Sequence, residues 1–241
     1  MILDVAFSRL DPACRSASGR AVAVIDVIRA TTTITMALHH GCAGVIPVRT
    51  LSEAMALARR LDGGALLAGE RNAEKAKGCE LGNSPTEYGR PRIKDKMIVL
   101  TTTNGTRTFQ AVTEAQAIIA CSFLNVTAAA RWLTNTGLDI LIVCAGRQGR
   151  FCLEDVVGSG ILIDRLLSIS DRAYMLSDSA RTARQLFATY QNDLLGMLRD
   201  CEWGKEIIRK GFEADLEICA HVDLTDIVPV MREGRLVAER P

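Results

Sequence analysis

The chain has 241 residues, of which 48% are hydrophobic and 24% charged, and its formal net charge is +1. This composition is that of a globular protein and excludes a disordered chain. The near-neutral charge provides no general attraction to nucleic acid or to an anionic membrane. No apolar run reaches the roughly 18 residues that a membrane helix needs, and residues 1–7 read as a short strand without the basic region of a signal peptide. We therefore expect a cytoplasmic protein that binds neither nucleic acid nor membranes.

The eight cysteines show no C-x-x-C pair, the spacing that zinc and redox motifs use. Several lie in apolar segments, where a free thiol packs as a small hydrophobic side chain. Cys144 resembles a nucleophile by its place at the end of a predicted strand, but a core thiol is the interpretation we favour. We expect all eight cysteines to be reduced.

Continuous apolar runs alternate with helical patterns through the first two thirds of the chain. The runs typical of strands with both faces covered are 21–25, 44–48, 65–68, 97–100, 117–120 and 140–143. The helical stretches between and after them are 33–40, 52–61, 106–112, 125–135 and 154–167. This alternation predicts an α/β fold, a three-layer α/β/α sandwich with a largely parallel or mixed sheet.

Two segments depart from this alternation. Residues 72–96 are polar, contain Gly and Pro and lack periodicity, which predicts a long functional excursion. Beyond about residue 170 we expect helices and then a terminal turn or hairpin, over 172–190, 193–200, 202–210, 213–220 and 228–237. We expect one domain over 1–241, with a possible subdivision into a motif-bearing part, 1–170, and a helical cover, 171–241, that carries little of the chemistry.

Polar residues follow several of the predicted strands, at the sheet edge where open α/β folds bind ligands. The longest series follows the strand 97–100 and precedes a helix. Its members are Thr102, Thr103, Asn104, Gly105, Thr106 and Arg107. Backbone N–H groups at a helix N-terminus bind anions, glycine allows close approach of the backbone, and arginine adds donors for a phosphate. A helix cap accounts for only one or two of these residues, so we favour an anion site.

A second junction of this kind begins at Asp26, which ends the buried strand 21–25. A carboxylate there is placed to bind a metal or to act as a nucleophile; the alternative is that it caps the next helix. Arg29, Thr31 and Thr32 follow it and supply further donors at the helix start.

Two more strand ends carry carboxylates. Glu70 follows the strand 65–68 as a candidate metal ligand or general base, and Arg71 beside it is a candidate clamp for a phosphate or carboxylate. Glu154 and Asp155 open the helix after the strand 140–143. The helix dipole explains acids at that position, but Mg²⁺ also favours one or two such oxygens together with a substrate phosphate.

The amides and hydroxyls elsewhere are weaker candidates when each is taken alone. Asn83 and Ser84 lie in the excursion, where a plain turn is an equal interpretation. Asn125 is either a helix cap or a ligand contact. The three histidines stand apart from these motifs, which argues against a histidine-based catalytic triad.

Together these motifs resemble the 2-phosphosulfolactate phosphatase family, whose archaeal members act in coenzyme M biosynthesis. The matching segments occur in the family's order, at 25–33, 69–71, 81–85, 102–106, 122–125, 144–146 and 154–155. The resemblance implies a Mg²⁺-dependent hydrolase that converts 2-phospho-3-sulfolactate to 3-sulfolactate and phosphate.

We expect Mg²⁺ to be held by Asp26 and Glu70, with Glu154 or Asp155 as a third carboxylate. Segment 102–107 would bind the phosphoryl oxygens. The residues expected to act in catalysis are Asp26, Arg29, Glu70, Asn104 and Thr106. The residues expected to bind substrate are Thr31, Thr32, Arg71, Asn83, Ser84, Thr102, Thr103, Gly105, Arg107 and Asn125.

Three alternatives stay open at this point. The chain could be a phosphate-ester-binding or regulatory module without turnover, or a phosphatase for a different small phosphorylated acid. A phosphotransferase is less favoured, because neither the G-x-x-x-x-G-K-[ST] nor the G-x-G-x-x-G fingerprint occurs. We expect a homodimer, since symmetric dimers are the commonest oligomers.

Overall fold

All six apolar segments expected to be strands lie in one 11-stranded sheet, together with the N-terminal segment. The computed structural model of the chain describes residues 1–61, 64–170 and 172–241. The strands are β1 (Ile2–Ala6), β2 (Ala21–Ile25), β3 (Gly44–Pro47), β4 (Leu66–Arg71), β5 (Glu74–Lys75), β6 (Met97–Thr101), β7 (Ala117–Cys121), β8 (Ile140–Cys144), β9 (Met175–Leu176), β10 (Val228–Arg232) and β11 (Arg235–Glu239).

The strand order is β5-β4-β6-β3-β11-β10-β7-β2-β8-β1-β9. Strands β7, β2, β8, β1 and β9 run parallel to one another, and so do β4, β6 and β3. The hairpin β10–β11 stands between these two parallel groups and pairs antiparallel with β7 on one side and β3 on the other. The expected hairpin near the end of the sequence is therefore confirmed, and it occupies the middle of the sheet.

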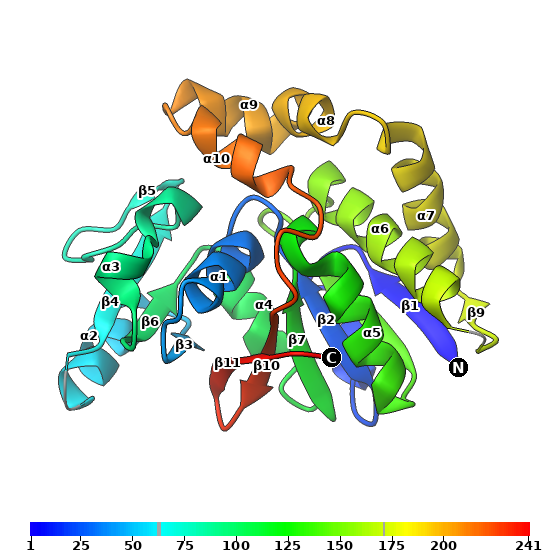
Figure 1. Cartoon of the computed structure of the whole chain (residues 1–241), viewed down its shortest axis with the longest axis horizontal. Helices are drawn as coiled ribbons and strands as arrows, with labels where there is room; N and C mark the ends of the chain where they lie inside the picture. Colours follow the sequence, from blue (N-terminus) through cyan, green and yellow to red (C-terminus); the bar gives the residue numbers. More distant parts are fainter. Residues whose placement is uncertain (62–63, 171) are drawn as a thin grey trace.

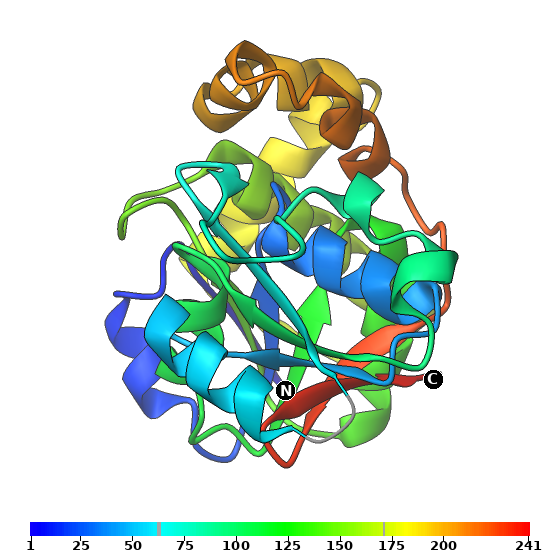
Figure 2. The same cartoon turned by 90° about the vertical axis from the view of Figure 1, so that its left-hand side faces the viewer.

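Helices cover both faces of the sheet (Figures 1 and 2), which confirms the α/β sandwich. They are η1 (Pro12–Ser16), α1 (Ala30–His39), α2 (Leu51–Arg60), η2 (Pro85–Glu87), α3 (Arg90–Ile93), α4 (Gly105–Ala111), η3 (Phe123–Asn125), α5 (Val126–Thr136), α6 (Leu153–Ile169), α7 (Asp178–Tyr190), α8 (Leu194–Asp200), α9 (Glu202–Arg209) and α10 (Glu213–Cys219).

The alternation of side chains along β2 shows why its sequence is apolar throughout. Ala21, Ala23 and Ile25 pack in one core cluster with α5, α6 and α7. Val22 and Val24 point the other way, into a second cluster that includes side chains of α1 and α4. A strand covered on both sides has no position that water reaches.

The helix expected over 172–190 begins later, at Asp178. Met175 and Leu176 instead extend the sheet as β9, whose register pairs them with Ile2 and Leu3 of β1. Ser177 then caps α7, because its side chain accepts a hydrogen bond from the backbone N–H of Ala180 at 3.1 Å.

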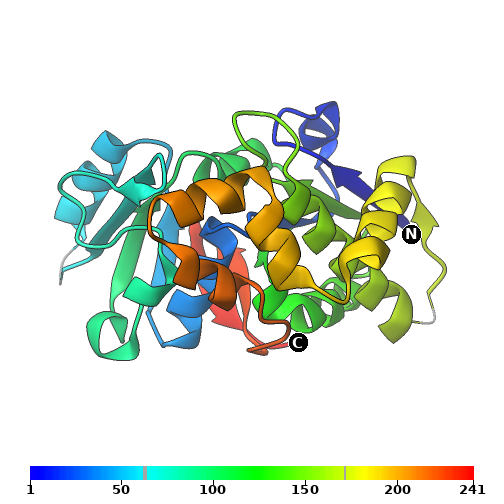
Figure 3. The ribbon, with the colours of Figure 1, turned by 90° about the horizontal axis from the view of Figure 1, so that it is seen from above.

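Helices α8, α9 and α10 form a cap at the top of the molecule in Figures 1 and 2, and Figure 3 shows them from above. The indole Nε1 of Trp203, on α9, donates to the carbonyl oxygen of Ile28 at 2.9 Å. Asp215, on α10, is bonded to Arg29 and Ser84. The cap thus reaches the loops that follow β2 and β5.

All eight cysteines lie in the described residues and are free thiols, as expected. No helix in the described ranges has both the length and the apolar character that crossing a membrane requires.

Candidate active site

The junction between β2 and α1 is held by its own threonines. Asp26, which is 8% exposed, accepts at Oδ1 from the backbone N–H of Ala30 at 3.1 Å. The hydroxyl of Thr31 donates to the carbonyl oxygen of Asp26 at 2.8 Å, and that of Thr32 donates to the carbonyl oxygen of Val27 at 2.8 Å. Thr31 and Thr32 were expected to bind ligand; both are fully buried and fix the backbone that presents Asp26.

Several polar groups of the threonine-rich loop after β6 are also hydrogen-bonded to protein atoms. Thr102 and Thr106 exchange hydrogen bonds, in which each backbone N–H donates to the other hydroxyl at 3.1 and 3.0 Å. The backbone N–H of Thr103 donates to Glu70 Oε1 at 2.6 Å, and Asn104 Oδ1 accepts from the backbone N–H of Gln148 at 3.2 Å. The expectation that this whole row of amides faces a ligand is therefore corrected, because three of the N–H groups are bonded to protein side chains.

Gly105 brings the two junctions together. A Cβ atom at this position would lie 2.5 Å from the Cβ of Ala30 and 2.7 Å from Oδ2 of Asp26. Only a residue without a side chain fits there. Gly105 therefore serves the site by allowing the starts of α1 and α4 to meet over Asp26.

Replacing Gly105 by Ala is expected to lower the free energy of unfolding by about 1–3 kcal/mol and to abolish most activity, because the new methyl group displaces Asp26. The matched control is Gly89→Ala, since a Cβ there meets nothing closer than 4.0 Å and the backbone φ is −66°. Urea unfolding and phosphate release measure the two effects. Equal stability and equal activity in the two variants would contradict this account.

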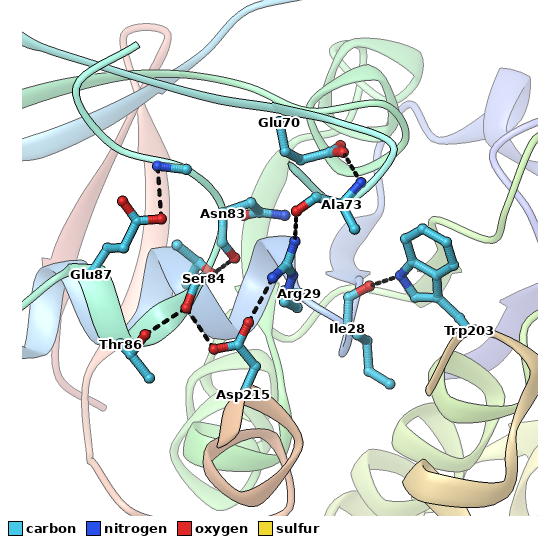
Figure 4. Close-up of polar contacts among 12 residues, drawn as sticks. Ile28, Arg29, Glu70, Ala73, Asn83, Ser84, Thr86, Glu87, Trp203 and Asp215 are labelled. Carbon is cyan, nitrogen blue, oxygen red and sulfur yellow. Dashed lines mark hydrogen bonds and ion pairs between the residues drawn. The ribbon is translucent and has the colours of Figure 1, made fainter. Parts of the chain in front are cut away.

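Glu70 binds loops with both of its carboxylate oxygens. Oε1 accepts from Thr103 N–H, and Oε2 accepts from the backbone N–H of Ala73 at 3.0 Å (Figure 4). Arg71 runs beside it, where its guanidinium donates to the carbonyl oxygen of Glu70 and to Thr101 Oγ1 at 3.2 Å. Both residues hold the ends of β4 and β6 together; Glu70 also lines the pocket, whereas Arg71 is not among its lining residues.

Asp155 and Glu154 differ in how their oxygens are used. Asp155 accepts from the backbone N–H of Val27 at 2.9 Å with Oδ1 and from that of Gly146 at 3.0 Å with Oδ2. Burial raises the pKa of Glu154, while hydrogen bonds to it, including those from the thiols of Cys201 and Cys152, act in the opposite direction. Both carboxylate oxygens of Asp155 are therefore bonded to loop backbone. Glu154 lines the pocket, and its side-chain neighbours there are thiols.

The buried carboxylates make the pocket receptive to positive charge. Burial, together with the nearby charges of Glu70 and Glu154, raises the pKa of Asp26 to about 7. Burial likewise raises the pKa of Asp155, with the charges of Asp26 and Glu154 adding to the effect. A cation placed among these groups would relieve both the desolvation and the mutual repulsion.

Arg29 is buried, at 2% exposed, and its charge is already neutralised. One amino group donates to Asp215 Oδ2 at 2.6 Å, and the other donates to the carbonyl oxygen of Ala73 at 2.5 Å (Figure 4). Its guanidinium carbon lies 4.7 Å from the ring centroid of Phe212. Ser84 donates to the second oxygen of Asp215 at 2.5 Å. The hydroxyl of Ser84, expected to contact substrate, therefore supports Arg29 through Asp215.

A small pocket of about 50 Å³ lies where these loops converge. It is lined by Asp26, Ile28, Arg29, Glu70, Asn72, Asn83, Thr102, Thr103, Asn104, Gly146, Arg147, Gln148, Cys152, Glu154, Asp155 and Trp203. Two of its polar atoms, Asn83 Oδ1 and Thr103 Oγ1, are buried and have no hydrogen-bond partner among the described residues. Buried polar groups are normally satisfied, so these two atoms indicate a ligand position.

Two expected site residues lie away from this pocket. Arg107 is exposed on α4. Asn125 is fully buried, and its amide caps η3 and binds the carbonyl oxygens of Ala120 and Ile227 at 3.3 and 3.0 Å. Asn125 was expected either to cap the helix that follows it or to contact a ligand, but its side chain makes no capping hydrogen bond to α5.

The pocket also contains residues that the strand-end rule did not identify. Trp203, on α9 of the cap, lines the pocket, and Asp215, on α10, bonds the lining residue Arg29, although the cap was expected to carry little of the chemistry. Arg147 and Gln148 lie in the turn after β8, and the guanidinium carbon of Arg147 stands 4.2 Å from the ring centroid of Trp203. Their position after a strand was a signal in the sequence, but Asp215 and Trp203 had none of this kind.

Comparisons with known proteins bear on the chemistry. Residues 10–234 match the 2-phosphosulpholactate phosphatase family. A protein of Thermotoga petrophila named probable 2-phosphosulfolactate phosphatase is 43% identical over 221 residues, which cover 92% of this chain and 93% of the relative. The chain belongs to the 2-phosphosulfolactate phosphatase family. It is a phosphatase that hydrolyses a phosphate monoester.

Other members of the 2-phosphosulfolactate phosphatase family match over similar lengths. A protein of the same name from Thermotoga maritima is 42% identical over 92% of this chain and 93% of its own length. One from Clostridium acetobutylicum is 33% identical over 98% of this chain and all of its own length. The family match extends past residue 155, where the quoted motifs end, to residue 234, and it includes α8, α9 and α10. The cap is thus part of what this family shares.

Proposed function

We propose that the protein hydrolyses 2-phospho-3-sulfolactate to 3-sulfolactate and phosphate with the help of Mg²⁺. The observation that carries this proposal is the pair of unpartnered buried atoms, Asn83 Oδ1 and Thr103 Oγ1, in a pocket lined by carboxylates. An oxygen acceptor and a hydroxyl beside acids suit a metal ion and a phosphoryl group bound together. The relatives' printed names support the sulfonated substrate.

The carboxylates can be sorted by their free oxygens. Glu70 and Asp155 each have both oxygens bonded to backbone N–H groups. Asp26 uses only Oδ1 in this way, and Glu154 is bonded by its own backbone N–H and by two thiols and not by another loop. We therefore assign Asp26 and Glu154 as the residues that would hold Mg²⁺, which revises the expected pair of Asp26 and Glu70.

Two carboxylates suit Mg²⁺, which keeps water and substrate among its ligands, better than they suit an ion coordinated by protein side chains alone. Within residues 1–61, 64–170 and 172–241 no three His, Cys, Asp or Glu side chains are grouped to hold a metal. Mg²⁺ is usually bound by one or two carboxylates, with water and substrate phosphate completing its shell. When bound, the ion would neutralise charge on the phosphoryl oxygens.

The surrounding residues then have separate tasks. Thr103 and Asn83 would supply polar atoms that orient the phosphoryl group and the ion, and Glu70 fixes the backbone of Thr103 and of Ala73. Arg29 lines the pocket as an ion pair with Asp215, and its guanidinium is held over the ring of Phe212. Electrostatic groups held in place before the reaction need no reorganisation as charge develops.

Phosphate release from racemic 2-phospho-3-sulfolactate, phospholactate and phosphoglycolate, each with Mg²⁺ and with EDTA, tests this function. We expect release that requires Mg²⁺ and is fastest with the sulfonated ester. Release mainly from the other two esters would keep the reaction and overturn the substrate. Undiminished release in EDTA would overturn the metal requirement, and no release from any of the three would overturn the proposed substrate class. The cytoplasmic location and the homodimer stay predictions.

A further inference from the structure

The pocket contains two arginines in unlike states. Arg29 is neutralised by Asp215, as described above. Arg147 forms no salt bridge within the described part of the chain. It is half-buried, and its charge opposes the rise that burial causes in the pKa of Glu154. Arg147 is therefore the cation of the pocket whose donors remain for a ligand.

The side chain of Arg147 is held in place without losing those donors. Its guanidinium carbon lies 4.2 Å from the ring centroid of Trp203, and the indole of Trp203 is fixed by its 2.9 Å hydrogen bond to Ile28. Stacking uses the face of a guanidinium and leaves the N–H groups at its edge. The turn beneath it is closed by hydrogen bonds in both directions between the backbones of Arg147 and Arg150, at 3.0 and 2.9 Å.

The inner pocket is small, with a volume of about 50 Å³, and is of a size that suits a phosphoryl group. A second cavity of about 660 Å³ adjoins it. Arg147, Trp203, Gln148, Cys152 and Glu154 line both cavities, so the part of a substrate beyond its phosphate must pass them.

We propose that Arg147, stacked on Trp203, binds the non-reacting anionic group of the substrate, its sulfonate or its carboxylate, and so determines specificity. The inference rests on the proposed function for the identity of that substrate. The other side chains of the outer cavity include the acids Asp200 and Glu202, which repel an anion, and one more cation, Arg150. Arg150 is exposed and does not line the inner pocket, and Arg29 does not line the outer cavity, so among the described residues Arg147 is the cation that lines both.

Isothermal titration calorimetry in Mg²⁺ tests this assignment without turnover, with 3-sulfolactate and inorganic phosphate as ligands. For Arg147→Ala we expect the Kd of 3-sulfolactate to rise by about 10- to 100-fold, as for a lost charge-assisted pair, and the Kd of phosphate to change by less than about twofold. Arg147→Lys should recover part of the loss, because it keeps the charge without the fork of donors. The matched control, Arg150→Ala, should bind both ligands like the unaltered protein.

Steady-state kinetics separate the two possible anions. A larger loss of kcat/KM in Arg147→Ala for 2-phospho-3-sulfolactate than for 2-phospholactate would place the sulfonate on Arg147. Equal losses for these two esters, with phosphate affinity unchanged, would place the carboxylate there. The proposal is overturned if phosphate and 3-sulfolactate lose affinity equally, if neither does, or if the unaltered protein does not bind 3-sulfolactate. If the proposed function itself is wrong, the unaltered enzyme will release no phosphate, which is a different result from those above.

Discussion

Replacing Asp26 by Asn is expected to lower kcat/KM for phosphate release by about 1,000-fold, the scale of losing one preorganised charged group from an active site. Asn retains an oxygen that can accept from the backbone N–H of Ala30, as Oδ1 does now at 3.1 Å. It lacks the negative charge with which Asp26 would hold Mg²⁺. The measurement is phosphate release at saturating Mg²⁺. Full activity of this variant would remove Asp26 from the central role.

The stability of the same variant shows whether it stays folded, and its pH dependence has a definite sign. Burial raises the pKa of Asp26 from 3.8 to about 7, so between these values the folded state binds a proton that the unfolded state has released. Stability therefore falls as pH rises through this window, and the cost is complete above about pH 7. Asn cannot ionise and escapes this cost.

In EDTA, Asp26→Asn should consequently be more stable than the unaltered protein at about pH 8, with a smaller difference at about pH 5. Thermal or urea unfolding at the two pH values measures this. A variant that is less stable at the higher pH would mean that Asp26 is stabilised in the fold by interactions that Asn does not reproduce.

Replacing Asp215 by Ala is expected to cost about 3–5 kcal/mol of unfolding free energy, because it leaves the Arg29 charge buried without its partner. The two side chains are each 2% exposed and lie 2.6 Å apart. The hydroxyl of Ser84 loses an acceptor in the same change. Activity should fall as well, since the guanidinium of Arg29 lines the pocket. Urea unfolding and phosphate release measure the two effects.

An exposed pair of the same kind is the control. Asp226 and Arg240 are 2.9 Å apart, with side chains 65% and 68% exposed, and removing such a pair costs at most about 1 kcal/mol. The double variant Arg29→Met, Asp215→Leu should be more stable than Asp215→Ala, because no charge is left buried. A loss in Asp215→Ala no larger than in Asp226→Ala would show that the buried pair does not stabilise the fold.

The fold was predictable from the sequence wherever a strand is buried on both faces. Segments such as 21–25 and 140–143 are apolar at every residue, and this pattern is local. The place of the hairpin 228–239 was not predictable, because its neighbours β3 and β7 are far away along the chain. The two residues of β9 were missed because so short a strand shows no recognisable alternation of apolar and polar side chains.

The candidate site divides in the same way. The rule that ligands bind at strand ends led to Asp26, Glu70, Thr103 and Glu154, all of which line the pocket. The rule cannot say which polar atoms the protein satisfies for itself, and so it included threonines that bond only to backbone.

Long-range partners are the other limit of the sequence. Asp215 lies 186 positions from Arg29, and Trp203 lies 175 positions from Ile28. Each sits on a cap helix whose own pattern is that of an ordinary surface helix. Only the folded structure shows that these helices complete the pocket.

The central position of β10–β11 has a consequence for how the protein is made. Strands β3 and β7 are synthesised early, yet the edges that face the hairpin stay open until residues 228–239 have left the ribosome. Open strand edges pair readily with other chains, and contacts between distant segments form slowly. A nascent chain that stops before residue 228 would therefore hold two half-sheets with exposed inner edges, a species prone to aggregate and a natural target for chaperones.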